Sequence, residues 1–175
     1  TVSGATLTND RHGRSNHAYS FNGTNGFIQV AHHSSLSLTS YSISVWHKPT
    51  VGGTRSIIMK DNHPSENYSL WVTGFTQFKP NNAPSMVQAY GEAIQLNQYY
   101  HYAVTKSASA LKIFINGSLD GQTTSMAIPS LNSQPLYFGH DGGFGYGKFQ
   151  GTMDDIRIYD RALSIAEVQA LYNLG

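Results

Sequence analysis

The segment GTMDDIRIYDRALSIAEVQALYNLG, residues 151–175, predicts a strand, a turn and a helix in that order. Ile156 and Ile158 alternate with Arg157 and Tyr159, which is the period-two pattern of a strand with one buried face. The chain therefore ends on a strand that contributes to a core and a helix that follows it closely.

The helix in this segment has a strong start signal. Ser164 is followed three residues later by Glu167, the spacing of a capping box, and Leu163 is placed to contact Val168 as a hydrophobic staple. Val168 and Leu171 then lie on one face at helical spacing. We expect a short helix that packs this face against the rest of the fold.

Short runs with strand character recur through the rest of the chain, separated by turn residues. They are residues 17–21, 27–30, 42–48, 56–60, 68–73, 86–90, 99–105, 111–115, 136–139 and 153–159. The Asn116-Gly117 pair predicts a type I′ hairpin turn, because both central positions of that turn need a positive φ. Many short strands and one terminal helix predict an all-β jelly-roll β-sandwich of two antiparallel sheets.

Composition limits the possible functions. The 175 residues suffice for a single domain, residues 1–175, whose first 14 residues are expected to be an edge strand or a frayed start. A net charge of +1 gives no reason to expect a nucleic-acid partner, and no apolar run has the length of a membrane span. The chain has no cysteine, so disulfides and thiolate metal sites are excluded. It begins at Thr1 without a signal peptide, from which we expect a mature product or an excised module.

Four pieces of the sequence occur in the order of one known family. They are AYSFNGTNGFIQV (18–30), SISVWHKP (42–49), YYHYAVTK with LKIFINGSL (99–119) and the closing segment 151–175. Together they resemble the laminin G-like, concanavalin A-like jelly-roll domains. The resemblance implies a secreted or cell-surface recognition module, in a family that includes lectins, carbohydrate-binding modules, adhesion domains and a few enzymes.

The same resemblance implies a structural calcium ion. In the family, the opening turn and an acidic pair near the last strand often hold calcium, and these positions correspond to Asn22 and to Asp154 or Asp155. Asn25 in the turn adds a further amide oxygen, a ligand type that calcium accepts. Asn22 departs from the aspartate that is frequent there, which should weaken binding. Alternatively, Asn22 and Asn25 only shape the turn, and one aspartate pairs with Arg157.

Sugars bind through their flat CH faces to aromatic rings and through their hydroxyls to polar side chains. Two loops and one strand combine such residues. The candidates are Asn62, His63, Tyr68 and Trp71 in the first loop and the strand after it, His140, Asp141, Phe144, Tyr146 and Lys148 in the second loop, and Trp46 in the strand 42–48. Other aromatic residues, Phe27 among them, are expected in the core.

Catalysis is not expected. A retaining glycosidase needs two carboxylates about 5 Å apart, but Asp154 and Asp155 are adjacent and should point to opposite faces of a strand. We therefore expect a non-catalytic carbohydrate-binding module whose partner is a glycan or polysaccharide, joined to other domains of a larger secreted polysaccharide-acting or surface protein. A protein-binding adhesion domain and a small glycoside hydrolase or polysaccharide lyase remain alternatives.

Overall fold

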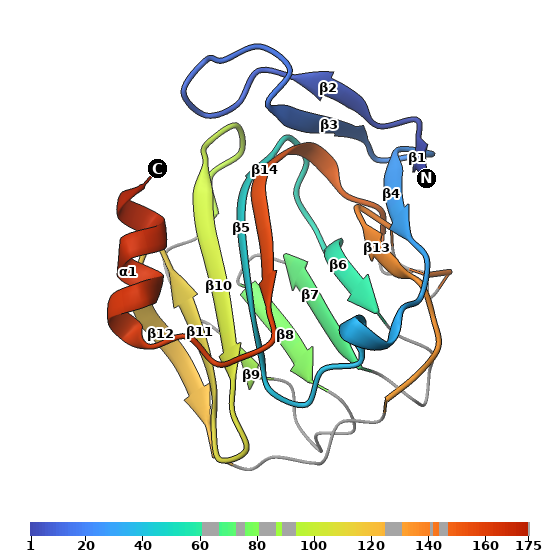
Figure 1. Cartoon of the computed structure of the whole chain (residues 1–175). Helices are drawn as coiled ribbons and strands as arrows, with labels where there is room; N and C mark the ends of the chain where they lie inside the picture. Colours follow the sequence, from blue (N-terminus) through green and yellow to red (C-terminus); the bar gives the residue numbers. More distant parts are fainter. Residues whose placement is uncertain are drawn as a thin grey trace.

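Two seven-stranded antiparallel sheets face each other in the computed structural model, and one helix follows at the C-terminus (Figure 1). The structure describes residues 1–60, 67–72, 76–80, 87–88, 94–124, 131–140, 142–143 and 147–174. The first sheet has the order β1 (Val2–Ser3), β4 (Phe27–Val30), β13 (Leu136–Phe138), β6 (Arg55–Lys60), β7 (Tyr68–Val72), β8 (Thr76–Pro80) and β9 (Val87–Gln88). The second has the order β12 (Ser118–Thr123), β11 (Leu111–Ile115), β10 (Tyr100–Lys106), β5 (Tyr41–Pro49), β14 (Gln150–Tyr159), β3 (Ala18–Asn22) and β2 (Thr6–Thr8).

This architecture confirms the predicted jelly-roll β-sandwich. The first residues form edge strands, because β1 ends the first sheet and β2 ends the second. Strands β8 and β12 were not among the predicted strands. The glycine-rich turn at residues 22–26 joins strands of different sheets, since β3 belongs to the second sheet and β4 to the first. A short 3-10 helix, Ser34–Leu36, follows β4.

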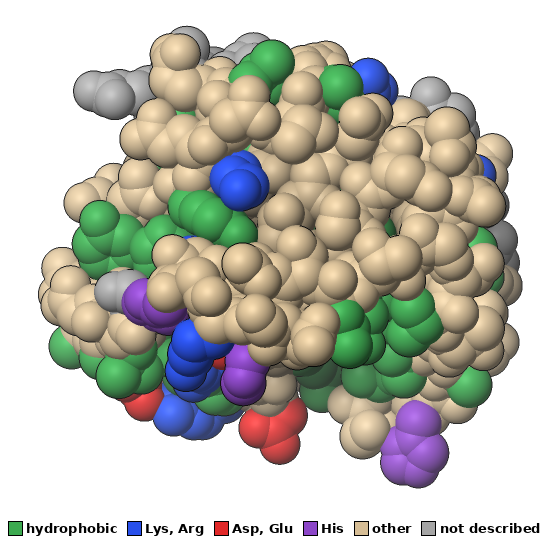
Figure 2. Space-filling model, turned by 90° about the horizontal axis from the view of Figure 1, so that it is seen from above, with side chains coloured by type: hydrophobic (Ala, Val, Ile, Leu, Met, Phe, Trp, Pro, Cys, Tyr) green, Lys and Arg blue, Asp and Glu red, His purple; other side chains and the backbone are tan. Residues whose placement is uncertain are grey.

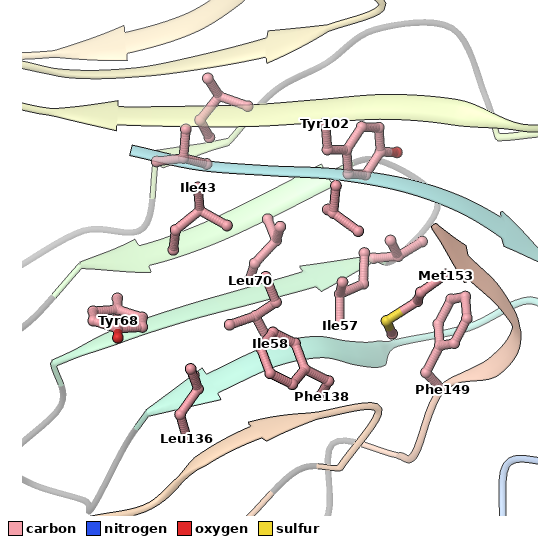
Figure 3. Packing of buried hydrophobic residues seen from close by; sticks show 14 of the residues in the cluster. Ile43, Ile57, Ile58, Tyr68, Leu70, Tyr102, Leu136, Phe138, Phe149 and Met153 are labelled. Carbon is pink, nitrogen blue, oxygen red and sulfur yellow. The ribbon is translucent and has the colours of Figure 1, made fainter. Parts of the chain in front are cut away.

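The core lies between the two sheets. Figure 3 shows side chains from β5, β10 and β14 directed toward those from β6, β7 and β13. Ile43 and Tyr102 of the second sheet are fully buried, as are Ile58 and Leu70 of the first. Each such side chain contributes roughly 1.5–3 kcal/mol through removal of its apolar surface from water. The alternation of inward and outward residues along these strands decides which side chains remain available outside.

Helix α1 (Ile165–Asn173) covers the outer face of the second sheet. Its capping box is confirmed: the Ser164 side chain accepts from the Glu167 backbone N–H, and the Ser164 N–H donates to the Glu167 carboxylate. Leu163, Val168 and Leu171 are buried in a cluster with Ala103 and Phe114. Among the residues described, no helix is long and apolar enough to cross a membrane.

The Asn116-Gly117 turn connects β11 and β12 as predicted. Its two residues have φ values of 49° and 75°, the left-handed conformation that a type I′ turn requires. The Asn116 side chain also accepts a hydrogen bond of 3.0 Å from the His101 backbone N–H, which ties the turn to β10.

Candidate functional site

Three aromatic rings lie together on the outer face of the first sheet. Phe27 comes from β4, Tyr137 from β13 and His140 from the segment after β13, and all three are partly exposed. The ring centroids are 6.1 Å apart for Phe27 and Tyr137, 5.3 Å for Phe27 and His140, and 5.2 Å for Tyr137 and His140. We call these three residues the ring cluster.

The position of the ring cluster follows from strand alternation. Leu136 and Phe138 belong to the core, so Tyr137 between them points outward. In β4, Ile28 packs against the core, and Phe27 therefore faces outside. The expectation that Phe27 belongs to the core was wrong for this reason.

Polar groups border the ring cluster. The Gln29 amide donates to the Tyr137 hydroxyl over 3.2 Å. The backbone N–H of Gly142 donates to Nδ1 of His140 over 2.9 Å, so the neutral ring carries its proton on Nε2. Lys148 lies nearby, because Phe149 N–H bonds to the carbonyl of Gly139, next to His140. The surface thus combines apolar ring faces with amide, imidazole and ammonium groups.

The opening turn is organised by Asn22. Its Oδ1 accepts hydrogen bonds from the backbone N–H groups of Thr24, Asn25 and Gly26, at 3.0, 3.1 and 2.9 Å. Its amide nitrogen donates to Oδ1 of Asn25 over 2.6 Å. The alternative in which Asn22 and Asn25 shape the turn accounts for these contacts. Lys148 adds a hydrogen bond of 2.7 Å to the Thr24 carbonyl, which links the turn to the ring cluster.

The structure does not bring the four predicted calcium ligands together. Asn22 pairs with Gln150, and Asp154 lies four residues further along β14. At about 3.3 Å per residue, the two ends are separated by roughly 13 Å. One ion cannot contact both the turn and the aspartates at that separation. Within the described ranges, no group of three or more His, Asp or Glu side chains has a metal-binding arrangement.

Asp154 and Asp155 are held by arginines. Nη1 of Arg11 donates to Asp154 over 2.7 Å, and Nε and Nη2 of Arg157 donate to Asp155 over 2.7 and 3.0 Å. The expectation that these aspartates face opposite sides was wrong, because Asp155 adopts φ 48° in a β-bulge of β14. Both line the same cavities, but as partners of Arg11 and Arg157 they act as structural acceptors.

Three predicted ligand residues lie in buried positions. Tyr68 is in the core, with its hydroxyl bonded to the Leu36 carbonyl. Trp71 is on the outer face of the first sheet but is only 3% exposed. Trp46 is on the outer face of the second sheet, stacked against Tyr172 of α1. The expectation that these rings are exposed was therefore wrong. Asn62, His63, Asp141, Phe144 and Tyr146 lie outside the described residues.

An apolar cleft opens at one edge of the sandwich. It has a volume of about 450 Å³ and lies where β14, after its bulge, has no pairing partner on the β3 side among the described residues. Ile28, Val30, Ile156 and Ile158 are among its lining residues, and Val30 is 41% exposed. This cleft is a second open feature, with a chemistry different from that of the ring cluster.

A sequence model of the concanavalin A-like lectin/glucanases superfamily (Laminin_G_3) matches residues 22–169. The chain belongs to this superfamily. The match includes the whole ring cluster, whereas the residues before β3 precede it. No curated protein matches the chain in sequence.

Solved structures with the same fold include three kinds of protein. The binding domain of Paraclostridial Mosquitocidal Protein 1 has a TM-score of 0.80 and 18% identity, and the match covers 99% of this chain and 47% of that one. Domain 4 of AbnA, an extracellular arabinanase of Geobacillus stearothermophilus solved with arabinotriose, has a TM-score of 0.70 and 21% identity over 96% and 87% of the chains. The pentraxin of Limulus polyphemus has a TM-score of 0.67 and 20% identity over 87% and 80%.

At these identities the likeness shows the fold alone. The chain spans about half the length of the mosquitocidal binding domain and of the botulinum toxin binding domain it resembles. Proteins with this fold differ in what they bind, so the fold does not identify the ligand of this chain.

Proposed function

We propose that this chain is a non-catalytic carbohydrate-binding module and that the ring cluster is its sugar-binding surface. The observation that carries the proposal is the set of three partly exposed rings, Phe27, Tyr137 and His140, with centroids 5.2–6.1 Å apart. A pyranose or furanose ring stacks its CH groups on such a surface. Gln29 and Lys148 at its border supply hydrogen bonds for sugar hydroxyls.

A role without catalysis agrees with the ion pairs that three of the carboxylates form. Asp154 and Asp155 form ion pairs with arginines, and Glu167 is used by the helix cap and Arg161. None of these three groups has the free position that a catalytic acid or nucleophile needs. The module would hold a larger secreted or cell-surface protein near its polysaccharide and so raise the local concentration of substrate. The likeness to a domain of an extracellular arabinanase supports this role.

The test is a titration of the protein with a panel of soluble polysaccharides and oligosaccharides that includes arabinotriose. Each titration is run with and without EDTA, because the calcium ion remains an untested prediction. We expect Tyr137→Ala to weaken binding at least about tenfold, since stacking on aromatic rings supplies much of such affinities. Tyr159→Ala is the matched control, a partly buried strand tyrosine on the second sheet.

Two outcomes would contradict the proposal. One is the absence of binding to any glycan at millimolar concentration. The other is equal weakening by Tyr137→Ala and Tyr159→Ala, which would place the site elsewhere.

A protein-binding role is the second candidate, and the apolar cleft beside Val30 favours it. The variant Val30→Asp would abolish such binding without disturbing the ring cluster, because Val30 is 41% exposed. Loss of a partner in this variant, with glycan binding absent in the wild type, would favour the second candidate.

A further inference from the structure

A polar cavity of about 500 Å³ lies on the outer side of the second sheet. It forms where the loop between β2 and β3 meets the β14 bulge and the end of α1. We call it the arginine pocket; its lining residues are Arg11, His12, Arg14, His17, Asp154, Asp155, Arg157 and Leu174. Figure 2, which views the molecule from above, shows basic, histidine and acidic side chains gathered near one edge of that view. The volume is in the range of a small-molecule site.

Most acceptor oxygens of the arginine pocket already have a hydrogen-bond partner. Asp155 accepts from Arg157 with both carboxylate oxygens. Asp154 accepts on Oδ2 from the side chain and from the backbone N–H of Arg11. Asp10, behind the pocket, accepts from Arg14 and from the backbone of His12 with its two oxygens, and its side chain is 0% exposed.

The donors of the pocket are not used to the same extent. Each guanidinium has five N–H groups. The side chain of Arg14 donates to Asp10 through Nε alone and is 62% exposed, and neither of its Nη groups has an acceptor in the part of the chain that is described. Nε of Arg11 is buried without a partner in the same part of the chain. The pocket therefore offers more N–H donors than acceptors, and three guanidinium groups against two carboxylates line it.

These donors are held in place. Arg11 lies 4.8 Å above the centroid of the Trp46 ring and pairs with Asp154, so its side chain is only 8% exposed. Asp10 is fixed by hydrogen bonds from two backbone N–H groups and in turn orients Nε of Arg14. Preorganised guanidinium groups bind planar or tetrahedral oxyanions with little loss of side-chain freedom.

We propose that the arginine pocket binds a small solute through an oxyanion group, a carboxylate or a sulfate, held mainly by the Nη groups of Arg14. The histidines add N–H groups for further oxygens of the ligand. Four lining residues, from Arg11 to His17, precede the part of the chain that the superfamily model matches, whereas the ring cluster lies within that part.

The test follows the protein by NMR during titration with sodium sulfate, sodium glucuronate and, as an uncharged comparison, glucose, all at constant ionic strength. We expect sulfate and glucuronate to shift the arginine Nε–H signals of the pocket saturably, and glucose to leave them unchanged. The two anions distinguish a tetrahedral from a planar oxyanion group. Tyr137→Ala should bind both anions like the wild type, which separates this site from the sugar-binding surface.

Arg14→Gln should weaken anion binding roughly tenfold, because it removes a charged donor pair. Arg14→Lys should weaken binding less, since it keeps the positive charge near Asp10 but loses the paired N–H donors of the planar guanidinium group. Thermal unfolding checks that both variants are folded. Arg161→Gln is the matched control, an exposed arginine outside the pocket that is paired with Glu167. Equal weakening by Arg14→Gln and Arg161→Gln, or equal shifts with glucose, would overturn the proposal.

Discussion

The outer faces of the two sheets each carry a cluster of three aromatic rings that includes one histidine. On the first sheet it is the ring cluster. On the second it is Trp46, His101 and Tyr172, with centroids 5.2–6.0 Å apart, which we call the covered cluster. Helix α1 and Arg11 cover the second group, and His101 is fully buried. Similar chemistry therefore serves packing on one face and is available for a ligand on the other.

The largest expected effect comes from the covered cluster. Trp46→Ala should lower the free energy of unfolding by about 3–5 kcal/mol, because it removes the ring that contacts Tyr172, His101 and Arg11. Tyr137→Ala in the ring cluster should cost only about 1 kcal/mol, as is usual for a partly exposed side chain. Urea unfolding at pH 7 measures both. Equal decreases in the free energy of unfolding for the two variants would mean that the two clusters do not differ in structural role.

Acid should act on the covered cluster through His101 and on the core between the sheets through His47. Burial, and then the charge of Arg11, lowers the pKa of His101 to about 4; burial, and then His101, lowers the pKa of His47 to about 3. Both rings are neutral in the folded state, so the unfolded chain takes up protons first. The stability that each neutral ring contributes is fully present well above pH 6.5 and is lost as the pH falls toward the folded-state pKa, by about 2 kcal/mol per histidine between pH 7.5 and pH 5.

Two variants separate these contributions. His101→Gln and His47→Leu should each reduce the loss of stability between pH 7.5 and pH 5, measured by urea unfolding at both values. His47→Leu should cost little at pH 7.5, because neither ring nitrogen of His47 has a partner among the described residues. An unchanged loss in both variants would show that other groups control the acid sensitivity.

The helix that covers Trp46 depends on its cap. Ser164→Ala should lower the free energy of unfolding by about 1 kcal/mol, because the Glu167 N–H loses its acceptor. Faster hydrogen exchange in the first turn of α1 would accompany the loss. Ser133→Ala, an exposed serine in a loop, is the control and should have no effect.

The smallest effect is expected within the ring cluster. Tyr137→Phe removes the hydrogen bond from Gln29 but keeps the ring. The free energy of unfolding should fall by only about 0.5 kcal/mol, because water replaces the lost hydrogen-bond partner of Gln29 at a partly exposed site. Glycan affinity should fall less than in Tyr137→Ala. A loss as large as that of Tyr137→Ala would mean that the hydroxyl, and not the ring face, binds the sugar.

Much of the fold could be predicted from local patterns. The capping box at Ser164, the turn at Asn116-Gly117 and the strand 111–115 involve neighbouring residues, and all three were confirmed. Strand β12 was missed because this edge strand carries mixed polar residues with little alternation. The bulge at Asp155 was missed too, since nothing in the local sequence marks its left-handed φ.

The candidate site was harder to predict. His140 and Lys148 were expected and lie at or beside the ring cluster, but Phe27 was assigned to the core and Tyr137 was not singled out. The alternation in FIQV and LYF does indicate both, because each pattern places one aromatic ring on the face opposite the residues that pack in the core. Trp46, Trp71 and Tyr68 looked suitable only because composition does not reveal burial.

The sequence by itself determined the family, the strand and turn pattern and the capped helix, because short-range hydrogen bonds and side-chain periodicity fix these features. Tertiary structure alone decided which rings face water. A side chain on the outer face of a sheet is buried or exposed according to what packs over it, and Trp46 is covered by Arg11 and Tyr172, which are distant from it in the chain. The same long-range contacts placed Arg11 beside Asp154 and formed the arginine pocket.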